Sequence, residues 1–384
     1  MMKLFLLCMC VAFAQGGMAP LYQAKERGVP HSYIVRLKDA SDVDQVADEL
    51  EGYFTKMRTP IGKMNKIRLV MRALTLRIPP HLVNYVRSLD CVEYIEQDSL
   101  GQTAGQQTGA TWGIDRIDQR YLPLDNTFSY NDFYQGTGVN VYVVDTGTNP
   151  NHSEFKGNRA QLLFGAADDN GHGTHCSGTA SGEVYGIARQ SIIQSVKVCN
   201  SWGGCAVSDF TAGCDSVIAH NQVPKGVVSM SLRFGASTTI DDAVVKLWNG
   251  GYVVSIAAGN DDSDACNYSP QRVVNTITTG ATDRYDKRAY FSNYGTCVDI
   301  FAPGVNIVSA DYKNVYGTSV LSGTSMACPH VTGVAALYVG KHGSVSPQWI
   351  KTEMLSDATE NVVSDVKGSP NKLLCSIGVS TQQI

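Results

Sequence analysis

A series of short runs of apolar and β-branched residues lies beyond Trp112, and these runs constrain the fold more than any other feature. They read VNVYVVD, SVKV, GVVSMSL, YVVSIAAGN and NTITTGA, and helical patterns such as SDFTAGCDSVIAH and DDAVVKLWNG separate several of them. Strands that are apolar on both sides are typical of a parallel sheet covered by helices on both faces. The sequence therefore predicts an α/β fold, in which ligand sites gather at the carboxyl ends of the strands.

The first residues have the pattern of a secretory signal peptide, which we assign to residues 1–14. One lysine precedes an apolar run from Leu4 to Ala14 that ends on Ala-Phe-Ala and is short for a membrane span. No other apolar stretch of the sequence is long enough to cross a bilayer. We therefore expect a secreted, extracellular protein, in which cysteines can form disulfides.

Composition excludes some classes of partner. The chain has 384 residues, of which 43% are hydrophobic and 17% charged, so it can bury a core and form more than one domain. The formal net charge of −4 gives no sign of a polybasic surface. We therefore expect neither nucleic acid nor a membrane as a partner.

The segment from His31 to Leu100 has a pattern of its own. Strand-like SYIVRL, ALTLRI and VEYIEQ alternate with helical DVDQVADELEGYF and HLVNYVRSL. This β-α-β-α-β order predicts a small α+β domain of the split βαβ type. The following stretch GQTAGQQTGAT, residues 101–111, lacks apolar periodicity and is interpreted as an exposed, cleavable linker.

Ser325 lies in LSGTSMACPH, directly before the small, apolar helical pattern VTGVAALYVG. A Ser or Thr at the start of a helix is most often an N-cap, a role that Thr324 can also fill. A hydroxyl at a helix N-terminus can also be a nucleophile, because backbone N–H groups and the helix dipole stabilise an oxyanion beside it. The second interpretation requires a base, an orienting acid and another oxyanion donor elsewhere in the chain.

Three further segments contain candidates for these roles. Asp145 ends the run VYVVD, where a carboxylate is either a turn former or an orienting acid. His172 and His175 in NGHGTHCSGT suggest a metal pair, but no third ligand stands at a matching spacing, so a base beside a structural histidine is favoured. Asn260 ends SIAAGN and is either a turn residue or a neutral oxyanion donor.

In their order along the chain, these motifs resemble the subtilisin-like serine proteases (subtilases), and within them the proteinase K-like branch. The matching stretches are VVDTG, NGHGTHCSGT, SLRFG, SIAAGN, NYSP, ATDRYDKRAYFSNYGTCVDIFAPG and SGTSMACPHVTGVAAL. The resemblance implies a subtilisin-like sheet, a catalytic triad of Asp145, His172 and Ser325, and Asn260 as oxyanion donor. It further implies a monomeric endopeptidase that cleaves protein or peptide substrates through an acyl-enzyme and needs no cofactor for this chemistry.

The resemblance also implies a self-processing zymogen. Residues 15–104 resemble the inhibitory propeptide of subtilases, and residues 105–384 resemble the catalytic domain, so we expect autocleavage near Ala104. The propeptide is then an intramolecular inhibitor and a partner of the catalytic domain. The alternative is a permanently attached accessory domain.

Relatives bind substrate as an added β-strand between two segments, which here are WGGCA and SLRFG. Arg233 and Phe234 stand where the family usually has glycines, so we expect altered specificity. These side chains narrow the primary pocket, favour an acidic substrate residue, or point to solvent. The substrate-binding residues implied are Gly203, Gly204, Ser231, Leu232, Arg233, Phe234, Gly235, Ala257, Ala258 and Gly259.

Some cysteines and a metal site are also implied by the resemblance. It pairs Cys266 with Cys297, whereas the pairing among Cys199, Cys205, Cys214 and Cys375 stays open. It makes Asp299 the carboxylate of a structural calcium site, with the backbone carbonyls of Val274 and Thr276 as further ligands.

Two other functions are found among proteins with this resemblance. A catalytically dead relative would act only by binding, but the intact triad and Asn260 argue against it. A processing enzyme for one precursor is the other, but no long domain follows Ile384, so we expect a degradative or semi-specific endopeptidase.

Overall fold

The structure is a computed structural model that describes residues 17–24, 28–59, 62, 64–99, 104–131 and 134–376. The chain divides into two compact units, Met1–Gln102 and Thr103–Ile384. The signal peptide expected at residues 1–14 lies outside the described residues.

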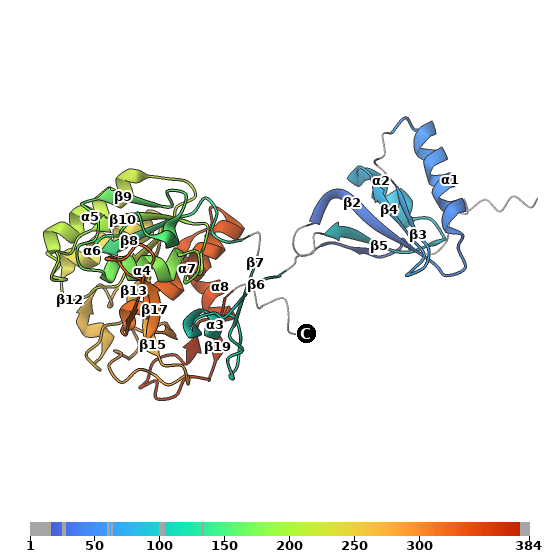
Figure 1. Cartoon of the computed structure of the whole chain (residues 1–384). Helices are drawn as coiled ribbons and strands as arrows, with labels where there is room; N and C mark the ends of the chain where they lie inside the picture. Colours follow the sequence, from blue (N-terminus) through green and yellow to red (C-terminus); the bar gives the residue numbers. More distant parts are fainter. Residues whose placement is uncertain are drawn as a thin grey trace, which may run out of the picture. The chain divides into compact units, whose positions relative to one another are not determined.

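The described part of the first unit is a small α+β fold (Figure 1). Its strands lie in the order β1-β5-β2-β4-β3. They are β1 (Leu21–Tyr22), β2 (Gly28–Leu37), β3 (Asn65–Ile67), β4 (Ala73–Arg77) and β5 (Val92–Ser99), with helices α1 (Val43–Lys56) and α2 (Pro80–Arg87). The two helices bury one apolar side each, including Leu50 and Phe54 of α1 and Val83 of α2, against the sheet. The predicted β-α-β-α-β order is confirmed, and β1 and β3 are additions that the pattern did not show.

The described part of the second unit contains a nine-stranded sheet in the order β19-β20-β16-β15-β13-β11-β8-β10-β9. All pairs are parallel except β19 with β20. The strands are β8 (Asn140–Asp145), β9 (Ala160–Phe164), β10 (Ile192–Lys197), β11 (Val227–Met230), β13 (Val253–Ala257), β15 (Ile277–Thr282), β16 (Ile300–Pro303), β19 (Thr359–Glu360) and β20 (Lys372–Leu373). The parallel sheet predicted from the apolar runs is confirmed.

Helices cover both faces of this sheet. They are α3 (Trp112–Ile117), α4 (His172–Ser181), α5 (Val207–His220), α6 (Thr238–Asn249), α7 (Thr324–His342) and α8 (Pro347–Asp357), and short 3-10 turns η1 (Ser153–Phe155) and η2 (Ala265–Asn267) lie between strands. Among the described residues, no helix combines the length and apolar character needed to cross a membrane.

Alternate residues of one strand enter two different cores. Val141 and Val143 of β8 pack in the core that includes residues of α4 and α7. Tyr142 and Val144 pack in the core formed with α5 and α6. Because successive side chains point to opposite faces, this division accounts for runs that are apolar throughout.

The segment interpreted as a linker is partly a strand. β6 (Ala104–Thr108) pairs antiparallel with β7 (Thr127–Asn131), and the ladder joins Thr108 to Thr127. A main-chain ladder needs no apolar periodicity, so the polar composition hid this strand. Further short pairs are β12 (Phe234–Gly235) with β14 (Tyr268–Ser269) and β17 (Ile307–Ala310) with β18 (Thr318–Leu321).

Among the described residues, the second unit contains two disulfides. Cys266 is joined to Cys297, as the resemblance implies, and Cys199 is joined to Cys205. Cys214 and Cys375 remain buried thiols. The open question of their pairing is thereby answered.

Candidate active site

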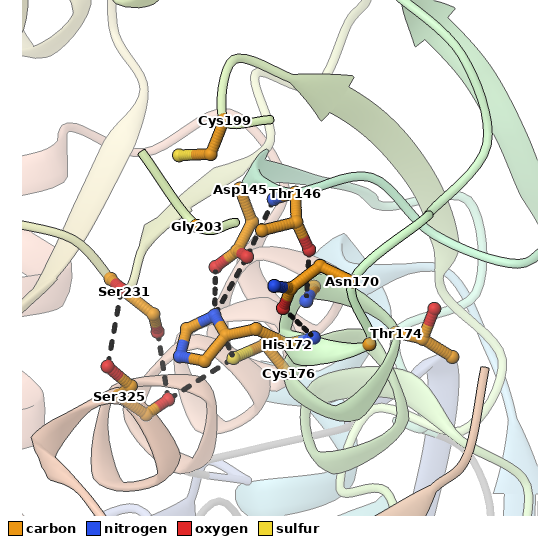
Figure 2. A network of polar contacts seen from close by, with 12 residues as sticks. Asp145, Thr146, Asn170, His172, Thr174, Cys176, Cys199, Gly203, Ser231 and Ser325 are labelled. Carbon is orange, nitrogen blue, oxygen red and sulfur yellow. Dashed lines mark hydrogen bonds and ion pairs between the residues drawn. The ribbon is translucent and has the colours of Figure 1, made fainter. Parts of the chain in front are cut away.

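Asp145 and His172 meet at the carboxyl edge of the sheet (Figure 2). Asp145 is the last residue of β8 and His172 the first of α4. His172 Nδ1 lies 2.8 and 3.0 Å from the two carboxylate oxygens of Asp145. Asp145 is buried and His172 is partly exposed, and the other ring nitrogen, Nε2, faces Ser325 (Figure 2). The pair can therefore present an oriented basic nitrogen to a reacting group.

The carboxylate also sets the protonation of this imidazole. Burial alone would lower the pKa of His172, but the charge of Asp145, the interaction with Cys176 and the hydrogen bonds to both side chains together hold that pKa well above its ordinary value. A histidine with this partner is stabilised when it gains a proton, as a general base must be.

Two glycines let the loop that follows β8 pack directly on the first turn of α4. A Cβ at Gly173 would lie 2.1 Å from the carbonyl oxygen of Gly147, which leaves no room for a larger residue. Asp168 supports the same turn, because its carboxylate accepts from Thr146 Oγ1 at 2.9 Å and from Thr174 N at 2.9 Å. Although burial alone would raise the pKa of Asp168, its hydrogen bonds lower it. Asp168 was not predicted from the sequence, although the Asp-Asp-Asn-Gly turn before His172 is a signal for it.

Ser325 is the second residue of α7, and the N-cap of this helix is Gly323, without a side-chain cap hydrogen bond. Ser325 Oγ donates to the carbonyl oxygen of Ser231 at 3.2 Å, and Ser231 Oγ donates to the carbonyl oxygen of Ser325 at 2.9 Å. Neither Ser325 nor Thr324 is therefore the N-cap that the general preference suggested. The Thr324 hydroxyl instead accepts from Gly259 N at 3.0 Å.

Asn260 is oriented by the start of α7. Its Oδ1 accepts from the Thr324 backbone N–H and hydroxyl, both at 2.9 Å. This leaves the amide nitrogen, Nδ2, as the donor on the other side of the side chain. Asn293 braces the same loop, since its Nδ2 donates to Ala258 O at 2.9 Å and its Oδ1 accepts from Asp261 N at 2.9 Å. Asn293 lies in one of the motifs that carry the resemblance, but no role was predicted for it.

The two histidines of HGTH have different environments. His175 is buried, its Nε2 lies 2.9 Å from Ile307 O, and burial lowers its pKa to about 4. It is therefore a neutral structural residue. A metal ion at this site is a separate question. Within the described residues, one group of three or more histidine, cysteine or acidic side chains lies close enough to hold a metal ion. It consists of Asp145, His172 and Cys176, whose ligand atoms lie within 4.8 Å of one another. Burial raises the pKa of the Cys176 thiol, which favours the neutral form, and Asp145 engages His172 Nδ1, so these residues fit a catalytic group better than a metal centre.

Two cavities flank Ser231. One of about 210 Å³ is lined by Asp145, Thr146, Asn170, His172, Cys199, Gly203, Cys205, Ser231, Leu232 and Arg233. The other, of about 160 Å³, is lined by Ser231, Leu232, Arg233, Ala257, Gly259, Asn260, Thr324 and Ser325. The implied substrate-binding residues that line them are Gly203, Ser231, Leu232, Arg233, Ala257 and Gly259, whereas Gly204, Phe234, Gly235 and Ala258 line neither.

The side chains of Arg233 and Phe234 point in different directions and contact different residues. Phe234 packs edge-on against Phe210, with ring centroids 5.4 Å apart. The Arg233 guanidinium lies over the ring of Tyr268 at 4.7 Å and pairs with Asp261 at 2.7 Å. Only Arg233 therefore borders the cavities.

Gln271 joins the two walls of the smaller cavity and was not found from the sequence. Its buried Nε2 donates to Leu232 O at 3.0 Å and to Ala257 O at 2.6 Å. A glutamine in an irregular segment carries no local signal of this role, because the two carbonyls lie on other segments.

The expected calcium site needs a correction. Asp299 Oδ1 and the carbonyl oxygens of Val274 and Thr276 do converge, but on Lys351 Nζ, at 2.8, 3.0 and 2.5 Å respectively. A lysine ammonium lies where the resemblance implies a calcium ion, and Lys351 was not among the predicted site residues.

Asp115 and Asp118 form a different candidate for a cation. Both residues are buried, and the Oδ1 of each has no hydrogen-bond partner among the described residues. Their other oxygens accept from the backbone N–H of Asn126 at 2.9 Å and of Ser129 at 2.5 Å. Buried carboxylate oxygens without a partner fit an oxygen-liganded cation such as calcium. The signal available in the sequence was the pair of aspartates spaced by two residues.

A parallel α/β sheet with an aspartate–histidine pair beside a serine at a helix start is typical of serine hydrolases. The model of the subtilase family matches residues 136–373. The extracellular serine proteinase of Thermus sp. (strain Rt41A) is 42% identical, over 90% of this chain and 89% of that protein. Alkaline serine exoprotease A of Vibrio alginolyticus is 45% identical, over 78% of this chain and 58% of that protein.

A solved structure agrees with these relatives. A crystal structure of a cold adapted subtilisin-like serine proteinase has a TM-score of 0.67 and 45% identity, and the match covers 70% of this chain and 99% of that one. The chain belongs to the subtilase family. It is a subtilisin-like serine protease, which hydrolyses peptide bonds of protein or peptide substrates.

Proposed function

We propose that this protein is a secreted serine endopeptidase, made as a self-processing zymogen, whose triad is Asp145, His172 and Ser325. The observation that carries the proposal is the pairing of Asp145 with His172 Nδ1 at 2.8 Å, with the ring turned toward Ser325 at the start of α7.

In the proposed mechanism, Ser325 Oγ forms a bond to the substrate carbonyl carbon while its proton passes to His172 Nε2. Asp145 holds the imidazole in the correct tautomer and stabilises its positive charge. The carbonyl electrons move onto oxygen, where Asn260 Nδ2 and the Ser325 backbone N–H donate to the oxyanion. His172 then gives the proton to the leaving amine as the peptide bond breaks. Water hydrolyses the acyl-enzyme by the same steps, which regenerates Ser325.

In apo structures, catalytic hydrogen bonds are often long and tighten only with substrate bound. The 3.2 Å bond from Ser325 Oγ to Ser231 O is compatible with this, because a rotation about one side-chain bond redirects the hydroxyl. We therefore propose that the carbonyl oxygen of Ser231 holds the Ser325 hydroxyl when no substrate is bound.

The substrate is proposed to lie as an added strand between the segments of Gly203–Gly204 and Ser231–Gly235, with Ala257–Gly259 along the primary pocket. The two cavities that flank Ser231 support this placement. No prosthetic group is needed for the chemistry, and we expect a monomer that binds neither nucleic acid nor membrane.

We further propose that Arg233 sets the charge preference of the primary pocket. Its ion pair with Asp261 balances the charge at the pocket wall. Arg233→Gly would leave Asp261 unpaired and favour basic substrate residues, whereas Asp261→Asn would leave Arg233 unpaired and favour acidic ones. Each preference should change by roughly fivefold in relative kcat/KM, the effect of about 1 kcal/mol. Cleavage of a peptide library measures it, and identical cleavage sites for all three proteins would rule out this role.

Residues 15–104 are proposed to be the inhibitory propeptide, released near Ala104 after removal of residues 1–14. The compact unit Met1–Gln102 and the start of β6 at Ala104 support this boundary. After cleavage, the new N-terminus would remain tied to the catalytic unit by the ladder between β6 and β7.

A structural calcium ion is proposed at Asp115 and Asp118 rather than at Asp299. The unpartnered buried oxygens of Asp115 and Asp118 support it. Calcium should raise the melting temperature of the parent protein, and Asp118→Asn should abolish that increase, as measured with and without a chelator.

Intact mass and N-terminal sequencing of the secreted protein, beside Ser325→Ala, test the function. We expect the parent to lose the segment ending near Ala104 and to react with a fluorophosphonate probe, and the variant to do neither. A parent that keeps the segment and does not react with the probe would contradict the proposal.

A further inference from the structure

The oxygen cluster at Asp299 brings together three elements of the second unit. Asp299 immediately precedes β16, Val274 and Thr276 precede β15, and Lys351 lies within α8. The second carboxylate oxygen, Oδ2, accepts from Thr278 N at 2.9 Å. The cluster therefore ties α8 to the starts of two neighbouring strands.

The ammonium of Lys351 has a complete set of partners. It has three N–H donors, and three oxygens lie within hydrogen-bond distance: Asp299 Oδ1 at 2.8 Å, Val274 O at 3.0 Å and Thr276 O at 2.5 Å. Lys351 is only 7% exposed, which is rare for a lysine unless its charge is paired. The single carboxylate supplies one negative charge, which balances one ammonium.

The same oxygens are of the type that divalent calcium prefers, namely one carboxylate and two backbone carbonyls. An ammonium centred among them leaves no room for an ion at that position. The residues around Lys351 therefore do not fit a bound metal at this position.

We propose that the Lys351 ammonium is a built-in replacement for a bound divalent cation, so that the packing of α8 on the starts of β15 and β16 is independent of calcium. The segment held in this way also carries Gln271, which joins Leu232 and Ala257 at the wall of the substrate cavity.

Thermal unfolding of full-length Ser325→Ala protein tests the proposal without autolysis. All 4 tryptophans of the chain lie beyond residue 103, so tryptophan fluorescence reports on the second unit alone. Each variant is measured in a chelator and in calcium. Any calcium bound elsewhere stabilises the parent and the variants equally. The quantity compared is therefore the increase in melting temperature that calcium causes in each protein.

Lys351→Met keeps an unbranched side chain but removes the charge. We expect it to lower the melting temperature by roughly 5 to 10 °C in both buffers, because it leaves Asp299 without its cation. Lys372 is a matched control, because its Nζ also contacts one carboxylate, Glu360, and one carbonyl, Leu355 O, but Glu360 is exposed. Lys372→Met should lower the melting temperature by much less.

Lys351→Ala empties the position of the ammonium. If the oxygens form a cation site, calcium should raise the melting temperature of this variant by several degrees more than that of the parent. Lys351→Met with a melting temperature within about 1 °C of the parent would overturn the proposal. So would a Lys351→Ala variant that gains no more from calcium than the parent, since Lys351 would then be an ordinary ion-pair partner.

Discussion

The two short contacts between Asp145 and His172 Nδ1 determine which imidazole nitrogen faces the cleft. Because Asp145 contributes to the raised pKa of His172, we expect the proposed base to be protonated and inactive at low pH and to become active as the pH rises through that raised pKa. Asp145→Asn removes the charge. It should move the acid limb of the kcat/KM profile to lower pH and reduce kcat by about 10⁴-fold.

The pH profile of kcat/KM for a small peptide substrate measures both effects. An Asp145→Asn enzyme whose acid limb stays at the parent's pH would show that another group controls it.

Asn260 is held by Thr324 so that its amide nitrogen is left to donate to an oxyanion. Asn260→Ala should therefore lower kcat by about 10²- to 10³-fold with little change in KM, because the donor acts mainly in the transition state. Steady-state kinetics on the purified variant checks this. A variant that loses affinity but not kcat would place Asn260 in ground-state binding.

At the scale of elements, the two disulfides have different consequences. The bond between Cys199 and Cys205 closes a loop that contains Gly203, and all three residues line a cavity beside His172. Replacing both cysteines by serine should raise KM several-fold with little change in kcat. It should lower stability by about 2 kcal/mol, because the closed loop is short.

The other disulfide is the matched control. The bond between Cys266 and Cys297 spans 31 residues and lines neither cavity beside the triad. Its double serine variant should lose about 4 kcal/mol of stability and keep its KM. Denaturant unfolding and kinetics of both variants separate the two roles, and equal effects on KM would contradict the assignment.

At the scale of the molecule, buried neutral histidines should make stability depend on pH. Burial lowers the pKa values of His175 and His330 to about 4 from the ordinary 6.5. As the pH falls below about 6.5, the unfolded chain takes up protons that the folded chain does not accept until about pH 4. Stability is therefore fully present above this interval and is lost within it, by about 3 kcal/mol for each histidine.

Replacing His330 tests this directly. In the Ser325→Ala background, His330→Gln should flatten the decline of unfolding free energy across that interval by about 3 kcal/mol. Urea unfolding at several pH values measures it, and an unchanged slope would exclude His330 as a contributor.

Most of the fold followed from pattern because burial repeats along the chain. The run at β8 is apolar throughout, since Val141 and Val143 face one core while Tyr142 and Val144 face the other. The strand β6 escaped prediction because it is held mainly by its main-chain ladder with β7, which polar residues can form equally well.

Residue patterns along the chain were enough to predict the parallel sheet and to locate Asp145, His172, Asn260 and Ser325. Asp145 ends β8, His172 begins α4, Ser325 is the second residue of α7, and Asn260 lies in the loop that follows β13, so local pattern and family motifs locate them. The groups that surround these residues became known only from the folded chain. Folding brings separate segments together, and spacing along the chain does not encode the distances between them. These distances determine the partners of Lys351 and Gln271, the Cys199–Cys205 bond and the packing of Phe234 in the core.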